Sequence, residues 1–129
     1  MKKILILDDE KSLRFILRNI IERTGKYEIF ESESLQEAVT LCKENKFDAI
    51  FLDHNVSDGV GWQIAEEIRR NPEPYGSPKI VGMSGSVPYN TDRKLFDFFM
   101  EKPFSACEIM PKISGILAES NMPPTGIDA

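Results

Sequence analysis

The sequence predicts a three-layer α/β fold, in which a parallel five-stranded sheet lies between two layers of helices. Short apolar runs alternate along the chain with segments whose apolar residues recur at helical spacing. This alternation is typical of strand–helix–strand units and therefore of a parallel sheet. The run at residues 49–52 is apolar without interruption, which indicates a strand buried on both faces. Helices are therefore expected on both sides of the sheet.

The first two strands and their helices are predicted near the amino terminus. A strand at residues 4–7 is followed by a helix whose apolar residues recur at the spacing of one helix face: Leu13, Ile16, Leu17, Ile20 and Ile21. Gly25 is expected to end this helix in a left-handed conformation. Residues 27–32 alternate weakly and carry two glutamates, which favours a strand at the sheet edge. Ser34 and Glu37 have the spacing of a capping box that begins the second helix.

The third helix follows the apolar run at residues 49–52. It carries three apolar residues: Ile64, Ala65 and Ile68. It should end near Asn71, because the residue before a proline disfavours helical dihedral angles. Residues 79–83 are predicted to form the fourth strand. A weaker helical pattern at residues 86–96, with two apolar anchors at its end, predicts a fourth helix.

The fifth strand, at residues 98–101, leads into the last helix. Ser105 and Glu108 have the spacing of a second capping box. Pro111 falls inside this helix, where it removes a backbone hydrogen bond, so we expect it to kink or weaken the first turns.

Five strands and five helical segments place residues 1–119 in one domain, followed by a polar tail at residues 120–129. Right-handed crossovers, together with polar second and fifth strands, favour the flavodoxin-like strand order 2-1-3-4-5. In that order the first and third strands are neighbours, and the connections reverse direction between them. Ligands of open α/β sheets bind at such a reversal.

The polar residues at the strand ends predict a metal-dependent phosphoryl site. Three carboxylates, those of Asp8, Asp9 and Asp53, repel one another unless a cation lies among them, and Mg²⁺ prefers such oxygen ligands. Lys102 and Ser84 would then contact a phosphoryl group, the ammonium by charge and the hydroxyl by donation. Asp53, at the end of a central strand, is the candidate nucleophile that would form an acyl phosphate.

Composition argues against several classes of protein. The 129 residues carry a net charge of −5, whereas nucleic-acid binding relies on clustered Lys and Arg. The apolar run near the amino terminus is shorter than the roughly 7–15 residues of a signal peptide, and no segment approaches the roughly 20 of a membrane span. We therefore expect a cytoplasmic protein that binds neither nucleic acid nor membrane, with Cys42 and Cys107 as reduced thiols in helical core positions.

Over residues 1–119 these motifs resemble, in order and approximate spacing, the receiver domain of response regulators in two-component signalling. The resemblance is carried by the following residues: Asp8-Asp9-Glu10, Leu52-Asp53, Gly61, Ser84 and Lys102-Pro103-Phe104. It implies that Asp53 accepts a phosphoryl group from a histidine kinase or a histidine phosphotransfer protein. The protein would then be a signalling switch that acts on a downstream protein target, and not an enzyme, although it would support its own phosphorylation and dephosphorylation.

The resemblance also implies a set of metal ligands. Asp9, Asp53 and the main-chain carbonyl of Asn55 would bind Mg²⁺ directly, and Asp8 would help through a water molecule. These roles follow from the family and not from the spacing of the residues.

Four residues of the second half of the chain receive roles in the same way. Lys102 would contact the phosphoryl group, and Ser84 would swing toward it. Phe99 occupies the position of the aromatic switch residue that moves inward on activation. Pro103 is expected to follow a cis peptide bond, which X–Pro bonds tolerate at low cost.

Three departures from the family pattern stand out. Ser57 occupies the place of the family's usual proline. The interval from Ser84 to Lys102 is roughly one helical turn shorter than usual, and Pro111 interrupts the last helix. The last two departures fall on the segments that usually form the family's output face.

Two aromatic residues beside the site are given structural interpretations. Side-chain alternation points His54 away from Asp53, so we expect a surface residue that gates access. Trp62 is expected to be partly exposed at the start of a helix.

Two other functions are compatible with the same residues. A Mg²⁺-dependent phosphatase with an aspartyl-phosphate intermediate would need a second acid two residues after Asp53, where Asn55 stands. A phosphate-independent interaction module, or pseudo-receiver, would retain the acidic pocket without using it.

Overall fold

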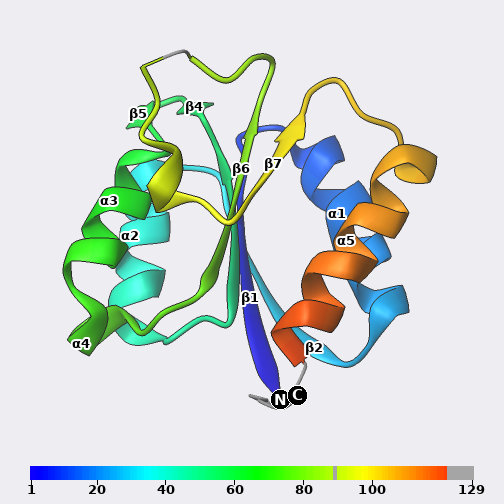
Figure 1. Cartoon of the computed structure of the whole chain (residues 1–129), viewed down its shortest axis with the longest axis horizontal. Coiled ribbons are helices and arrows are strands. Elements are labelled where there is room, and N and C mark those ends of the chain that lie inside the picture. The colour runs from blue at the N-terminus through cyan, green and yellow to red at the C-terminus, as the bar shows by residue number, and fades with distance from the viewer. Residues whose placement is uncertain (89, 122–129) are drawn as a thin grey trace.

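The computed structural model describes residues 1–88 and 90–121 (Figure 1). Its main sheet has five parallel strands in the order β2-β1-β3-β6-β7. In that order these strands are Tyr27–Ser32, Lys2–Leu7, Ala49–Asp53, Lys79–Ser84 and Phe98–Glu101. This is the predicted order 2-1-3-4-5, because the intervening β4 (Asn55–Val56) and β5 (Gly59–Val60) form a separate antiparallel hairpin.

Helices cover both faces of the sheet (Figure 1). One face packs against α1 (Lys11–Thr24) and α5 (Ala106–Asn121), and the other against α2 (Leu35–Glu44) and α3 (Gln63–Arg70). A single turn, α4 (Pro72–Tyr75), follows α3. The predicted three-layer flavodoxin-like fold is confirmed.

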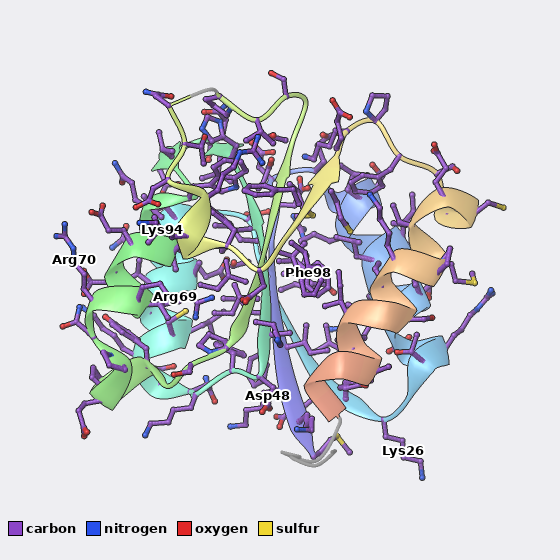
Figure 2. All side chains as sticks on the ribbon, viewed as in Figure 1. Lys26, Asp48, Arg69, Arg70, Lys94 and Phe98 are labelled. Carbon is purple, nitrogen blue, oxygen red and sulfur yellow. The ribbon has the colours of Figure 1, made fainter. Side chains whose placement is uncertain are left out.

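The central strands are apolar throughout because alternate residues enter two different cores. Leu5 and Leu52 belong to the core under α2 and α3, while Ile6 and Phe51 belong to the core under α1 and α5. Phe98, on the edge strand β7, packs against the second of these cores, in the space between the sheet and α5 (Figure 2).

The helix ends agree with the sequence only in part. At α5 both bonds of the predicted capping box form, since the Glu108 amide donates to Ser105 Oγ (3.3 Å) and the Ser105 amide donates to Glu108 Oε1 (2.9 Å). The expected left-handed cap at Gly25 is wrong, because this residue is extended (φ 165°). The next strand begins two residues later, at Tyr27, so the chain leaves the helix directly in the extended conformation.

The predicted helix at residues 86–96 is also wrong, because the described part of this segment holds only one 3-10 turn, η1 (Arg93–Leu95). The main apolar residues of this segment, Leu95 and Phe96, are adjacent at its end and do not form the stripe of a helical face. Arg69 of α3 holds the segment instead (Figure 2). Its guanidinium donates to the Leu95 carbonyl (3.1 Å), the Pro78 carbonyl (3.0 Å) and the Asp97 carboxylate (2.7 Å).

Three smaller expectations have mixed outcomes. Helix α3 ends before Asn71, as predicted, and α5 continues through Pro111. Cys42 is a buried thiol, but Cys107 is exposed, so only one of the two cysteines is a core residue. The predicted tail at residues 120–129 lies mostly outside the described residues. In the described part of the chain, no helix combines the length and apolar character needed to cross a membrane.

Candidate functional site

The candidate site lies at the carboxyl edge of the sheet, the upper edge in Figure 1. Strands β1 and β3 are parallel neighbours with Leu7 opposite Leu52. The next residues, Asp8 and Asp53, therefore lie side by side at this edge. Asp9 follows in the loop to α1, and one carboxylate oxygen from each of the three aspartates lies within 4.8 Å of the others. The fold thus brings together three acids from two distant parts of the chain.

Asp8 is fully buried, and its hydrogen bonds fix the loop after β1. Its amide donates to the Ser32 carbonyl (3.1 Å), and its Oδ1 accepts from the amide of Glu10 (2.9 Å). Its Oδ2 makes no hydrogen bond of regular geometry with the described residues. Lys102 Nζ lies 3.0 Å from this oxygen, so the contact is one of charge. A buried carboxylate oxygen of this kind is available to a further ligand.

Lys102 places an ammonium between the carboxylates. Its Nζ donates to Asp53 Oδ1 (3.1 Å) and lies 3.9 Å from Glu10 Oε1. The lysine follows β7, and its amide donates to the Ser84 carbonyl at 2.7 Å, which fixes its position relative to β6. The peptide bond from Lys102 to Pro103 is cis, as expected.

Burial and charge shift the pKa values of this pair. Burial raises the pKa of the Asp53 carboxyl to about 6, Asp8 adds to the rise, and Lys102 opposes it. Burial lowers the pKa of the Lys102 ammonium, but the contacts with Asp8 and Asp53 outweigh burial, so this pKa lies above its ordinary value. Lys102 therefore stays charged, and its ammonium is the positive group beside the three carboxyl groups of Asp8, Asp9 and Asp53.

The residues present fit a small divalent cation. With one ammonium against three acids, the cluster keeps an excess of negative charge whenever the acids are ionised, and uncompensated charge is costly at a buried site. The donors are carboxylate oxygens, which hard cations such as Mg²⁺ prefer. Asp8 Oδ2 is buried, and its charge contact with Lys102 is its one partner among the described residues, so this oxygen can also serve a cation or its water.

A cavity of about 350 Å³ opens beside Asp53 and is lined in part by Asn55 and Ser84. Asn55 begins β4, two residues after Asp53. Ser84 ends β6 and is buried, and its hydroxyl donates to the Ser86 carbonyl at 2.8 Å. Ser84, expected to contact the phosphoryl group, and Asn55, expected to bind Mg²⁺ through its main-chain carbonyl, therefore border the same space as Asp53.

Phe99 lies half-buried on β7 in a group of aromatic rings. Its ring centroid is 5.6 Å from that of Trp62 and 5.0 Å from that of Phe96. The Arg93 guanidinium lies 5.1 Å from the centre of the Phe99 ring. The ring therefore packs against the core under α3, while the movement expected of a switch residue remains a prediction.

Trp62 is more buried than the sequence indicated. It is 7% exposed, and its Nε1 donates to the Leu52 carbonyl at 2.9 Å. His54, half-buried, contacts it edge to face at a centroid distance of 4.6 Å. Gly82 makes room for the ring, because a Cβ at this position would lie 2.8 Å from Trp62 Cζ2. A glycine inside an apolar strand was the one signal that a large side chain packs there.

Two polar residues that support the site were missed by the sequence interpretation. Arg14 is buried in α1, and its Nη1 donates to the Asp8 carbonyl. It lies three residues before Leu17, on the buried face of the helix, and this spacing could have predicted from the sequence that Arg14 is buried. Asp58, at the tip of the β4–β5 hairpin, accepts the amides of Leu35 (2.7 Å) and Gln36 (3.1 Å) at the start of α2.

Comparison with known proteins gives a consistent set of relatives. The family model of the response regulator receiver domain matches residues 4–114. The sensory transduction protein LytT of Bacillus anthracis is 37% identical over 82 residues, which are 63% of this chain and 32% of LytT. The transcriptional regulatory protein SrrA of Staphylococcus aureus is 30% identical over 118 residues, which are 89% of this chain and 47% of SrrA. The chain thus spans about a third to a half of these relatives.

Solved structures show the same fold. A two-component response regulator from Clostridium difficile aligns with a TM-score of 0.73 and 28% identity, over 95% of this chain and all of that chain (100%). The response regulator TrrA of Thermotoga maritima, solved in complex with Mg²⁺-BeF, aligns with a TM-score of 0.74 and 28% identity, over 90% of this chain and 99% of that one. TrrA was also solved in complex with the histidine kinase ThkA, with a TM-score of 0.71 and 28% identity, over 91% of this chain and 99% of that one.

Proposed function

This chain belongs to the family of response regulator receiver domains, and we propose that it is a switch controlled by phosphorylation of Asp53. One observation carries the proposal. Lys102 Nζ lies within 3.1 Å of Asp53 Oδ1 and within 3.0 Å of Asp8 Oδ2, inside a cluster of three carboxylates at the sheet edge. This arrangement offers a nucleophile together with a fixed positive charge for phosphoryl oxygens.

The phosphoryl group would come from a phosphohistidine on a histidine kinase or a histidine phosphotransfer protein. A carboxylate oxygen of Asp53 attacks the phosphorus atom, so that an O–P bond forms and the N–P bond of the donor breaks. The donor imidazole keeps the electron pair of that bond and takes up a proton. The structural similarity to TrrA, which was solved with a histidine kinase, supports this choice of partner.

Mg²⁺ would be held by Asp9, Asp53 and the main-chain carbonyl of Asn55, with Asp8 bound through water. When bound, such an ion neutralises charge that develops on the phosphoryl oxygens. The fit of the acid cluster to a hard cation supports this assignment, as does the similarity to the Mg²⁺-BeF complex of TrrA.

The remaining residues would respond to the new group. Lys102 exchanges its bond with Asp53 for contacts to phosphoryl oxygens. Ser84 turns its hydroxyl from the Ser86 carbonyl toward the phosphoryl group, across the cavity that Ser84 and Asp53 both line. Phe99 follows as the aromatic switch residue. Phosphorylation replaces the single charge of the Asp53 carboxylate by the about −1.5 to −2 charges of a phosphoryl group at neutral pH, and this added charge drives the change.

The output would be a contact with a downstream protein. We place the domain, residues 1–119, in the cytoplasm, where a kinase has access to ATP, and we assign it no nucleic-acid or membrane ligand of its own. Because the described part of the connection from β6 to β7 contains only a 3-10 turn, the surface beside β7 differs from one built on a full helix.

Acetyl phosphate with Mg²⁺, followed by intact-mass measurement, tests the proposal. We expect one adduct of phosphate mass in the unmodified protein and none in Asp53→Ala. Absence of an adduct in the unmodified protein would support a pseudo-receiver instead. Multiple turnover on phosphate esters would support a phosphatase, although Asn55 provides no second acid for that reaction.

A further inference from the structure

Arg14 occupies a position in which charged side chains are rare. It lies on the face of α1 that packs against the sheet, and its side chain is only 10% exposed. Charged residues are seldom buried unless they are paired. Arg14 is close to the acid cluster, yet it contacts none of the three carboxylates of that cluster among the contacts described.

The guanidinium joins two segments at the carboxyl edge of the sheet. Nη1 donates to the main-chain carbonyl of Asp8 at 2.5 Å, and Nε donates to Glu31 Oε1 at 3.1 Å. Nη2 lies 3.9 Å from Glu33 Oε2. A planar fork of donors can serve a carbonyl and a carboxylate at once, whereas an ammonium is a single point of charge. Arg14 therefore ties the loop after β1 to the end of β2.

The bond to the Asp8 carbonyl fixes more than Asp8. That oxygen belongs to the peptide group that leads into Asp9, and a peptide group is planar. Holding the oxygen therefore sets the plane from which the Asp9 side chain departs. Asp9 itself is exposed, and no side-chain hydrogen bond or ion pair holds it among the described residues. Its direction toward Asp53 thus depends on the main chain.

The positive charge of Arg14 is balanced by nearby glutamates, so Arg14 can orient the loop after β1 without repelling a cation at the site. An isolated guanidinium near the cluster would repel a metal ion. Glu31 lies 3.1 Å from Arg14 and is shared with Arg18, and Glu33 and Glu22 add negative charge beside the two guanidinium groups. The net effect of Arg14 on the cluster is therefore one of orientation.

We propose that Arg14 is a positioning residue, which holds the Asp8–Asp9 peptide group so that the Asp9 carboxylate faces Asp53 and completes the metal site. The inference rests on the proposed function, because the ion concerned is the Mg²⁺ of that site. It adds a residue of α1 that touches neither the ion nor the phosphoryl group.

Calorimetric titration with MgCl₂ tests the inference without any phosphorylation. Arg14→Gln removes the fork, and Arg14→Lys keeps the charge and most of the buried stem. We expect both to raise the Kd for Mg²⁺ about tenfold, the loss typical of residues that orient metal ligands. Arg18→Gln is the matched control, because Arg18 shares Glu31 (2.6 Å) but its other bonds go to Ile29 and Glu22. We expect its Kd to change less than about twofold.

A second measurement separates positioning from a general loss of structure. The rate of phosphorylation by acetyl phosphate is measured against Mg²⁺ concentration for each variant, and folding is checked by circular dichroism. Arg14→Gln should approach the unmodified rate at saturating Mg²⁺, because the chemistry at Asp53 and Lys102 is intact. Arg14→Lys supplies a folded variant if Arg14→Gln does not fold.

Several results would overturn the role of Arg14. These are an unchanged Kd in Arg14→Lys, an equal loss of affinity in Arg18→Gln, or a maximal rate that stays low at saturating Mg²⁺. Failure of the proposed function looks different, because the unmodified protein would then bind no Mg²⁺ or form no adduct.

Discussion

Replacement of Gly82 by alanine tests how the core beneath the site is packed. Gly82 lies in the middle of β6, where most neighbouring residues are large and apolar. Alanine adds only one methyl group and removes a flexible residue, so in most strands the change would be neutral or favourable. Here the added carbon would meet two aromatic rings, and we expect the protein to be destabilised.

The size of the effect follows from the distances. The new Cβ would lie 2.8 Å from Trp62 Cζ2 and 3.1 Å from Cδ2 and Cε2 of Phe96, whereas carbon atoms pack best at about 3.5–4.0 Å. Trp62 has little freedom to retreat, because its Nε1 is bonded to Leu52 and its ring contacts His54 and Phe99. Overpacking of this kind costs about 1–3 kcal/mol. For a domain of this size, the Tm should fall by roughly 4–12 °C.

Urea unfolding followed by circular dichroism measures the change, and Gly115→Ala provides the control. Gly115 is exposed within α5, and a Cβ there would meet nothing within 4 Å. Alanine should therefore stabilise the helix by about 0.5–1 kcal/mol. Trp62→Phe supplies a double-mutant cycle, since a smaller ring at position 62 should reduce the cost of Gly82→Ala by about 1 kcal/mol.

The packing argument fails if Gly82→Ala leaves the free energy of unfolding unchanged. It also fails if the cost is the same in the presence and absence of Trp62→Phe, because the ring of Trp62 would then not be the obstacle.

Three further outcomes are expected. Lys102→Met should slow phosphorylation of Asp53 by acetyl phosphate about 10²-fold at saturating Mg²⁺, because the fixed charge beside the phosphoryl oxygens is lost. Intact-mass measurement over time gives the rate, and a rate close to that of the unmodified protein would contradict the role of Lys102. Asp58→Ala should lower the urea midpoint of unfolding, because two amides at the start of α2 lose their acceptor, and Asp58→Asn should recover part of the loss. Burial raises the pKa of the Glu31 carboxyl, but hydrogen bonds from Arg18 and Arg14 outweigh burial, so this pKa is lowered from 4.5. A carboxyl group whose pKa is lower in the folded state stabilises the protein at pH values above its unfolded-state pKa, and this stabilisation is lost as the pH falls through its folded-state pKa. Glu31→Gln should therefore lower the free energy of unfolding near pH 7 and make it decline less steeply below about pH 4.5.

Local patterns were sufficient for most of the fold. Apolar runs such as residues 4–7 and 49–52 identified the buried strands, because a strand covered on both faces carries apolar residues throughout. Connection rules then gave the strand order, and the order placed Asp8 beside Asp53. The acid cluster was predictable for the same reason, since parallel strands end at one edge of the sheet.

The errors came from segments whose conformation depends on distant partners. Residues 86–96 lack a helix in their described part, and the Arg69 guanidinium, from another helix, holds the end of the segment through the Leu95 carbonyl. Gly25 is extended because the chain passes within two residues from α1 into β2, whose position is set by its pairing with β1. Cys107 is exposed although it lies in a helix, since it falls on the outer face of the first turn of α5.

The sequence by itself determined which residues stand at the strand ends and therefore which chemistry the sheet edge can support. Only the tertiary structure decided what holds these residues in place: the Arg14 bond to the Asp8 carbonyl and the Trp62 ring in the space left by Gly82. Periodicity reports whether a residue faces the core. It carries no information on which atom of a distant segment that residue will meet, because such contacts are fixed by the packing of whole elements.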